Sequence, residues 1–134
     1  MAGRGGITSL QYLLNNESIA KNGNSTSAWI SYASPISGAF YVDMDSSGAA
    51  DITITMDYSP YSKEYLANLV AGGTTLTTEH YITETLSANN TTKTLQKLTT
   101  TTLDNPIGSL RVKVTENNVA ACTVTVIFAS FSID

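Results

Sequence analysis

The chain has 134 residues, of which 42% are hydrophobic and only 13% charged, and its formal net charge at pH 7 is −4. This length suits one domain with a core of its own, whereas about 25% charged residues is usual for soluble domains. The seven basic residues are scattered and no run of about 18 apolar residues occurs, so we expect neither nucleic acid nor a membrane as a partner.

The few chemically versatile side chains restrict the possible reactions. Cys122 is the only cysteine, which excludes an intramolecular disulfide and a cysteine-rich zinc site, and its apolar surroundings in sequence predict a buried side chain. His80 is the only histidine, and on a strand its neighbour Glu79 would point to the opposite face. No Gly-x-Ser-x-Gly motif is present. We therefore expect no enzyme activity, catalytic residue or cofactor.

A cluster of acidic residues is the one candidate for a metal site. Asp43, Asp45 and Asp51 surround a turn, as the oxygen ligands of a calcium loop would. The twelfth position of such a loop is Ile54, where a bidentate Glu is needed. The sequence therefore predicts no metal site.

Residues 1–26 are interpreted as an N-terminal arm and linker, and residues 27–134 as a β-sandwich domain. The arm carries apolar residues before a polar linker over 21–26, and helical spacing within it leaves its conformation open. The arm would pack either on its own domain or on a neighbouring subunit, and both alternatives stay open. Its predicted subunit contacts are Ile7, Leu10, Leu13 and Leu14.

The next segments alternate between apolar and polar residues with the period of two that is typical of half-buried strands. A strand over 27–32 is expected to end before Pro35. Residues 38–44 and 51–58 are expected to pair as a hairpin around the turn at 45–48.

One short helix is predicted near 60–71, with Pro60 at its first position and Gly72 and Gly73 at its end. Three tyrosines crowd around its start. Tyrosine suits interfaces because the ring packs while the hydroxyl forms hydrogen bonds. Tyr58, Tyr61 and Tyr65 are therefore added to the predicted subunit contacts.

The C-terminal half continues the strand pattern. Strands are expected over 81–86 and 92–101, and a second hairpin over 110–115 and 119–133. Apolar residues fall on both faces near Ile127 and Phe128, which indicates a central strand or one covered by another subunit. In total, seven or eight short strands and one helix predict an all-β fold, an antiparallel β-sandwich or jelly roll.

The chain resembles the capsid decoration or cement proteins of tailed-phage virions. The resemblance is carried by the arm over 1–20 and by the sandwich pattern over 27–134, including the stretches 37–44 and 50–56. It implies a homo-oligomer, with a trimer favoured, that binds capsid proteins at symmetry axes. Twenty Thr and fifteen Ser in an ion-poor chain also favour extensive protein contacts, because few charges need desolvation.

The leading hypothesis is therefore a structural virion protein that decorates a capsid by bridging its subunits. No secretion signal core is recognised, so synthesis in a host cytoplasm is expected. A first alternative is a subunit of a helical polymer, either a phage tail tube or an extracellular filament, built by exchange of the N-terminal arm. A second alternative is a carbohydrate-binding module that uses Trp29, Tyr58 and Tyr61.

Overall fold

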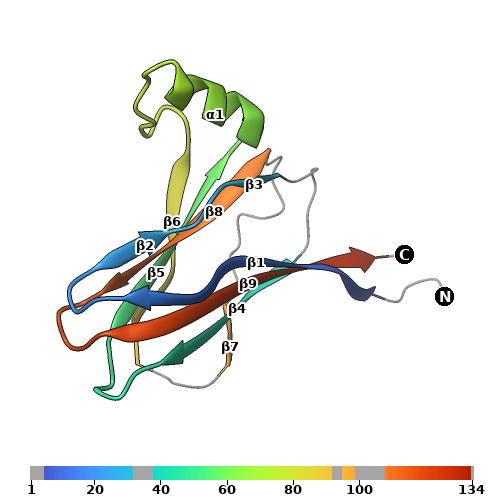
Figure 1. The fold of residues 1–134 in the computed structure, drawn as a ribbon. Coiled ribbons are helices and arrows are strands. Elements are labelled where there is room, and N and C mark those ends of the chain that lie inside the picture. The colour runs from blue at the N-terminus through green and yellow to red at the C-terminus, as the bar shows by residue number, and fades with distance from the viewer. Residues whose placement is uncertain (1–4, 32–37, 92–94, 99–107, 134) are drawn as a thin grey trace.

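The computed structural model describes residues 5–31, 38–91, 95–98 and 108–133 (Figure 1). In this part of the chain, the structure has nine strands and one helix. The strands are β1 (Gly5–Ile19), β2 (Asn24–Thr26), β3 (Ile30–Ser31), β4 (Gly38–Asp45), β5 (Ile52–Ser59), β6 (Ile82–Asn90), β7 (Gln96–Leu98), β8 (Ser109–Glu116) and β9 (Cys122–Ile133). The helix is α1 (Lys63–Ala71).

The strands form two antiparallel sheets, which confirms the predicted fold class. The first, here named sheet A, has the order β1-β9-β4-β7. The second, sheet B, has the order β2-β8-β5-β6, and β3 also pairs with β8. Figure 1 shows the sheets as two layers, with α1 at one end.

The core fills the space between the sheets. Alternate residues of the four central strands point inward, as the predicted period of two requires. The rings of Phe40 and Phe128 meet at a centroid distance of 4.8 Å within sheet A. From sheet B, Ile52, Ile54 and Met56 pack against them without exposure to solvent. This burial of hydrocarbon is the main contribution to stability.

Both predicted hairpins are wrong. β4 lies in sheet A and β5 in sheet B, and β8 and β9 are divided between the sheets in the same way. Two strands whose apolar faces meet across a core show the same alternation as two hydrogen-bonded neighbours, so the pattern alone does not separate these arrangements. The first crossing turn is held by Ser46, whose hydroxyl donates to the carbonyl of Ala121 at 2.8 Å.

The N-terminal segment is a strand, and it packs on its own chain. β1 pairs with β9 along its whole length, at the edge of sheet A. Leu13, Leu14 and Ile19 belong to the core. The predicted linker contains β2, which pairs with β8. Exchange of the segment between copies therefore stays a prediction, and an exchanged β1 would have to fill this same place in a neighbour's sheet.

The helix is confirmed, but it begins later than predicted. Its N-cap is Ser62 and not the residue before Pro60, because the Ser62 side chain accepts a hydrogen bond from the backbone N–H of Tyr65. Gly72 caps the C-terminus, and Gly73 follows with a φ of +93° that favours glycine. Within the described ranges, no helix is long and apolar enough to cross a membrane.

Candidate functional site

The outer face of sheet A, which points away from the core, carries a row of large apolar side chains. Tyr12 of β1, Ile127 of β9 and Tyr41 of β4 are register partners, so they lie side by side on one face. Leu10 of β1 adjoins the row, opposite Ala129. Leu10 and Tyr12 are 57% and 59% exposed, and Tyr41 and Ile127 are half-buried. These four residues are here named the outer patch.

Polar residues surround the outer patch. Lys97 of β7 is the register partner of Tyr41 and is exposed. Further along β4 the outward positions are Asp43 and Asp45, both exposed, and their partners in β9 are threonines. An apolar patch with a polar rim is typical of a surface that binds another protein.

The predicted contacts of the arm fall into different environments. Leu10 is exposed and belongs to the outer patch. Leu13 and Leu14 are buried in the core of the described chain. The backbone of Ile7 pairs with that of Phe131 in β9, but the Ile7 side chain lies outside the described part of the structure.

The predicted tyrosine contacts lie elsewhere in the sandwich. Tyr58 is a half-buried residue of β5 that packs against the core. Tyr61 and Tyr65 are 40% and 48% exposed at the start of α1, and their ring centroids are 4.9 Å apart. The structure therefore does not join the two predicted groups into one surface. Leu10 lies on sheet A, whereas Tyr58 lies in sheet B and the other two tyrosines lie at the start of α1.

Sequence reasoning missed Tyr12 and Tyr41 and gave only a partial signal for Ile127. Tyr12 follows Leu10 by two residues, which is the spacing of one strand face. The apolar residues on both faces of the last strand pointed to Ile127, although not to its partners. Tyr41 is placed beside Ile127 only by the pairing of β4 with β9, which the predicted hairpins did not contain.

A buried carboxylate joins three turns at the end of the sandwich opposite α1 (Figure 1). Glu116 accepts hydrogen bonds from the backbone N–H groups of Asn22, Asp51 and Val119, at distances of 2.9 to 3.2 Å. Burial raises the pKa of Glu116, but these donors and the backbone of Ala120 outweigh burial and lower the pKa to about 2. The charged group is a structural anchor between the sheets.

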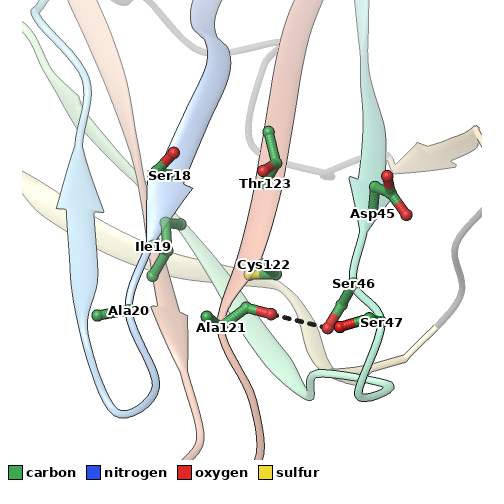
Figure 2. Close-up of a pocket in the computed structure, with 9 residues that line it drawn as sticks. All are labelled: Ser18, Ile19, Ala20, Asp45, Ser46, Ser47, Ala121, Cys122 and Thr123. Atoms are coloured by element: carbon green, nitrogen blue, oxygen red, sulfur yellow. Dashed lines mark hydrogen bonds between the residues drawn. The ribbon is translucent and has the colours of Figure 1, made fainter.

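A hollow of about 650 Å³ lies near this end, between the ends of β1, β9 and β4. Figure 2 shows its lining, which includes the Ser46 to Ala121 hydrogen bond and Cys122. The Cys122 side chain is buried, as predicted. Burial raises the pKa of the Cys122 thiol, and the negative charge of Glu116 raises it further, so the thiol stays protonated and is a poor nucleophile.

The single histidine takes part in a local turn. His80 lies in the loop between α1 and β6, where its Nδ1 accepts a hydrogen bond from the backbone N–H of Thr77 at 3.0 Å. In the described ranges, no three His, Cys, Asp or Glu side chains gather closely enough to hold a metal ion. The outer patch therefore remains the candidate site, and its arrangement suits contact with another protein surface.

The comparisons with known proteins support the fold. No protein-family model and no curated protein sequence matches the chain. Three solved structures of infectious bursal disease virus are similar, namely the T=1 particles derived from the virus, the VP2 subviral particle and the Gx strain. Their TM-scores are 0.58, 0.56 and 0.53, with sequence identities of 12%, 12% and 11%.

The similarity covers almost the whole chain but only part of the viral proteins. It spans 96%, 97% and 98% of this chain, and 32%, 33% and 33% of the respective viral chains. The chain thus spans about a third of the length of these viral proteins. At this identity the similarity establishes the fold, a β-sandwich that also occurs in the proteins of virus particles.

Proposed function

We propose that the chain is a non-enzymatic structural protein of a virus particle, and specifically that it decorates a capsid by bridging neighbouring subunits. The outer patch is the observation that carries this proposal, because the part of the chain that the structure describes leaves Leu10 and Tyr12 mostly exposed beside the half-buried Tyr41 and Ile127. The β-sandwich shared with proteins of infectious bursal disease virus particles supports it.

The proposed contact uses buried area and not chemistry. A partner that covers Leu10, Tyr12, Tyr41 and Ile127 removes their apolar surface from water. Each Å² of apolar surface buried in this way contributes about 25 cal/mol to the free energy of association. The partners are further copies of the chain, with a trimer favoured, and other capsid proteins. The protein would accordingly be located in the virion after synthesis in the host cytoplasm.

A second candidate function is a subunit of a helical polymer, and the position of β1 favours it. β1 is an edge strand of 15 residues, so one of its two sides is not paired within sheet A. Exchange of β1 between copies would place Leu13 and Leu14 in the core of a neighbour and would form an open chain of subunits. A phage tail tube or an extracellular filament is such a polymer.

Light scattering on a sizing column, followed by negative-stain electron microscopy, tests the proposal on the full chain. The decisive variant is Ile127→Lys, which places a charge in the middle of the outer patch. Thr55→Lys is the matched control, because Thr55 is a half-buried outward residue in the centre of sheet B. Both variants should keep the circular dichroism spectrum of the original chain.

We expect discrete oligomers from the original chain and from Thr55→Lys, and monomers from Ile127→Lys. Rods or tubes from the original chain would instead support the polymer. Monomers of the original chain at every concentration, with no binding to capsids of its own virus, would contradict both functions. Oligomers that persist in Ile127→Lys would show that the outer patch is not the contact surface.

A further inference from the structure

A second hollow, of about 410 Å³, lies between α1 and the segment before β3. It is lined by Ala28, Trp29, Lys63, Glu64 and Ala67, and most of its lining is hydrocarbon. The three helical residues have the spacing of one helix face, and the indole of Trp29 forms the opposite wall. The hollow lies on the sheet B side of the molecule, away from the outer patch.

The Trp29 ring is held in place by a network on the outer face of sheet B. The guanidinium of Arg111 lies 4.4 Å from the indole centroid, and the ring of Tyr81 meets the indole edge-on at 5.9 Å. Arg111 is fixed in turn by Asp57, with 2.9 Å between Nε and Oδ2, and Asp57 accepts from the Thr83 hydroxyl at 2.5 Å. A half-buried indole with a fixed orientation is a preorganised binding wall.

The rim of the hollow is polar and electrically balanced. Lys63 and Glu64 are adjacent and exposed, and their opposite charges cancel. A charged ligand would therefore gain little from them, and the net charge of −4 disfavours an anion further. Lys63 supplies donors and Glu64 supplies acceptors. This combination suits a neutral ligand that bears hydroxyl groups and one apolar face.

We propose that the hollow binds the ring of a neutral sugar. The apolar C–H face of the ring packs against the Trp29 wall, and the hydroxyls form hydrogen bonds with Lys63 and Glu64. Tyr61 and Tyr65 stack with each other and do not line this hollow. The site therefore keeps one residue of the aromatic set that the sequence predicted for carbohydrate, Trp29, and replaces the others by two residues of α1.

A fluorescence titration tests the proposal, because Trp29 is the only tryptophan and reports directly on the hollow. The probes are methyl glycosides of glucose, galactose, mannose and N-acetylglucosamine, with sialic acid as the anionic comparison. N-acetyl-leucinamide serves as a mimic of a protein side chain. We expect a saturable change in emission with at least one neutral glycoside, and a weaker response or none with the other two probes.

Two matched variants separate binding in the hollow from binding elsewhere. Ala67→Leu adds bulk inside the hollow at an exposed helical position, where Leu is a good helix former. Asn68→Leu places the same leucine side chain at the next exposed position of α1, which does not line the hollow. Ala67→Leu should abolish the response, and Asn68→Leu should preserve it, with both variants keeping the Tm of the original chain.

Three outcomes would overturn the proposal. The first is the absence of a saturable response to every neutral glycoside. The second is a response that survives in Ala67→Leu, since the sugar would then bind outside the hollow. The third is saturable binding of N-acetyl-leucinamide without any glycoside, which would assign the hollow to a protein partner.

Discussion

The two sheets share one core but differ in the faces that they turn outward. In sheet B, the outward residues of β5 and β8 are polar, and the register pair Asp57 and Arg111 forms an ion pair across the two strands. In sheet A, the corresponding outward residues include Tyr12, Tyr41 and Ile127. The outer face of β5 and β8 is therefore polar and is crossed by an ion pair, whereas the outer face of sheet A contains exposed hydrocarbon.

The two outer faces therefore have different roles, although both sheets contribute side chains to one core. The polar groups of sheet B contribute to the stability of a single chain, because Asp57 and Arg111 find partners within it. The outer patch contributes little in a single chain, because its largest residues face water. Its contribution is expected in an assembly, where a neighbour covers it.

The largest predicted effect compares two adjacent residues of β9. Phe128→Ala removes a fully buried ring from the core and should lower the free energy of unfolding by about 3 to 5 kcal/mol. Ile127→Ala removes a half-buried side chain from the outer patch and should cost only about 1 kcal/mol. Urea unfolding followed by circular dichroism measures both. Equal losses would mean that the outer face of sheet A is packed within the single chain.

The next effect concerns the carboxylate that holds the two sheets together at one end. Glu116→Gln keeps the size of the side chain but removes the charge that accepts from Asn22, Asp51 and Val119. We expect a clear fall in Tm at pH 7, smaller than for Phe128→Ala. Asp43→Asn, an exposed substitution on sheet A, is the control and should leave the Tm nearly unchanged.

Glu116 also predicts a pH dependence. Its pKa is about 2 in the folded chain against an ordinary value of 4.5, so the folded state favours the charged form. The stabilisation is complete above pH 4.5 and is lost as the pH falls from 4.5 through about 2. The stability difference between the original chain and Glu116→Gln should therefore shrink across this range. A stability difference that stays constant over this pH range would contradict the role of charged Glu116 as an anchor of the three turns.

The sequence was sufficient to predict most strands and the helix, because these depend on local periodicity. It did not predict which strands pair. The strands on either side of each predicted hairpin turn have apolar faces that meet across the core, and alternation is identical in both arrangements. The pairing of β4 with β9 and of β5 with β8 shows that these turns cross between the sheets, and the contacts of Ser46 and Glu116 with distant turns hold the crossing in place.

The candidate site shows the same limit. The sequence grouped Leu10 with Leu13 and Leu14 as one set of contacts, and the structure places them in different environments. A register shift in β1 between Tyr12 and Leu14 interrupts the period of two, so both leucines are buried although they are adjacent. Local patterning gives no signal for the role of Glu116, because its backbone partners Asn22 and Asp51 lie 94 and 65 residues away in the sequence.

A smaller effect is expected on the outer face of sheet B. Asp57→Asn removes the charge that holds Arg111 and should cost about 1 to 3 kcal/mol. Loosening of Arg111 should also change the emission of Trp29, which it covers. Urea unfolding and fluorescence measure the two effects. A loss of stability without any change in emission would show that Arg111 keeps its place over the indole without Asp57.

The smallest effect on stability, and the sharpest test of the contrast between the sheets, comes from Leu10→Thr. Leu10 is mostly exposed, so in a single chain the substitution should change the free energy of unfolding by no more than about 0.5 kcal/mol. In an assembly the same substitution replaces apolar contact area by a hydroxyl that needs a hydrogen-bond partner, and association should weaken.

Val70→Thr is the matched control for this substitution, because Val70 is about as exposed on α1 but lies outside the outer patch. Light scattering over a concentration series measures association, and urea unfolding measures stability. If a neighbouring subunit covers the outer face of sheet A, Leu10→Thr should associate more weakly than the original chain, and Val70→Thr should not. The free energy of unfolding should stay unchanged in both variants. Equal association of both variants would instead mean that the exposed hydrocarbon of β1 faces water in the assembly as well.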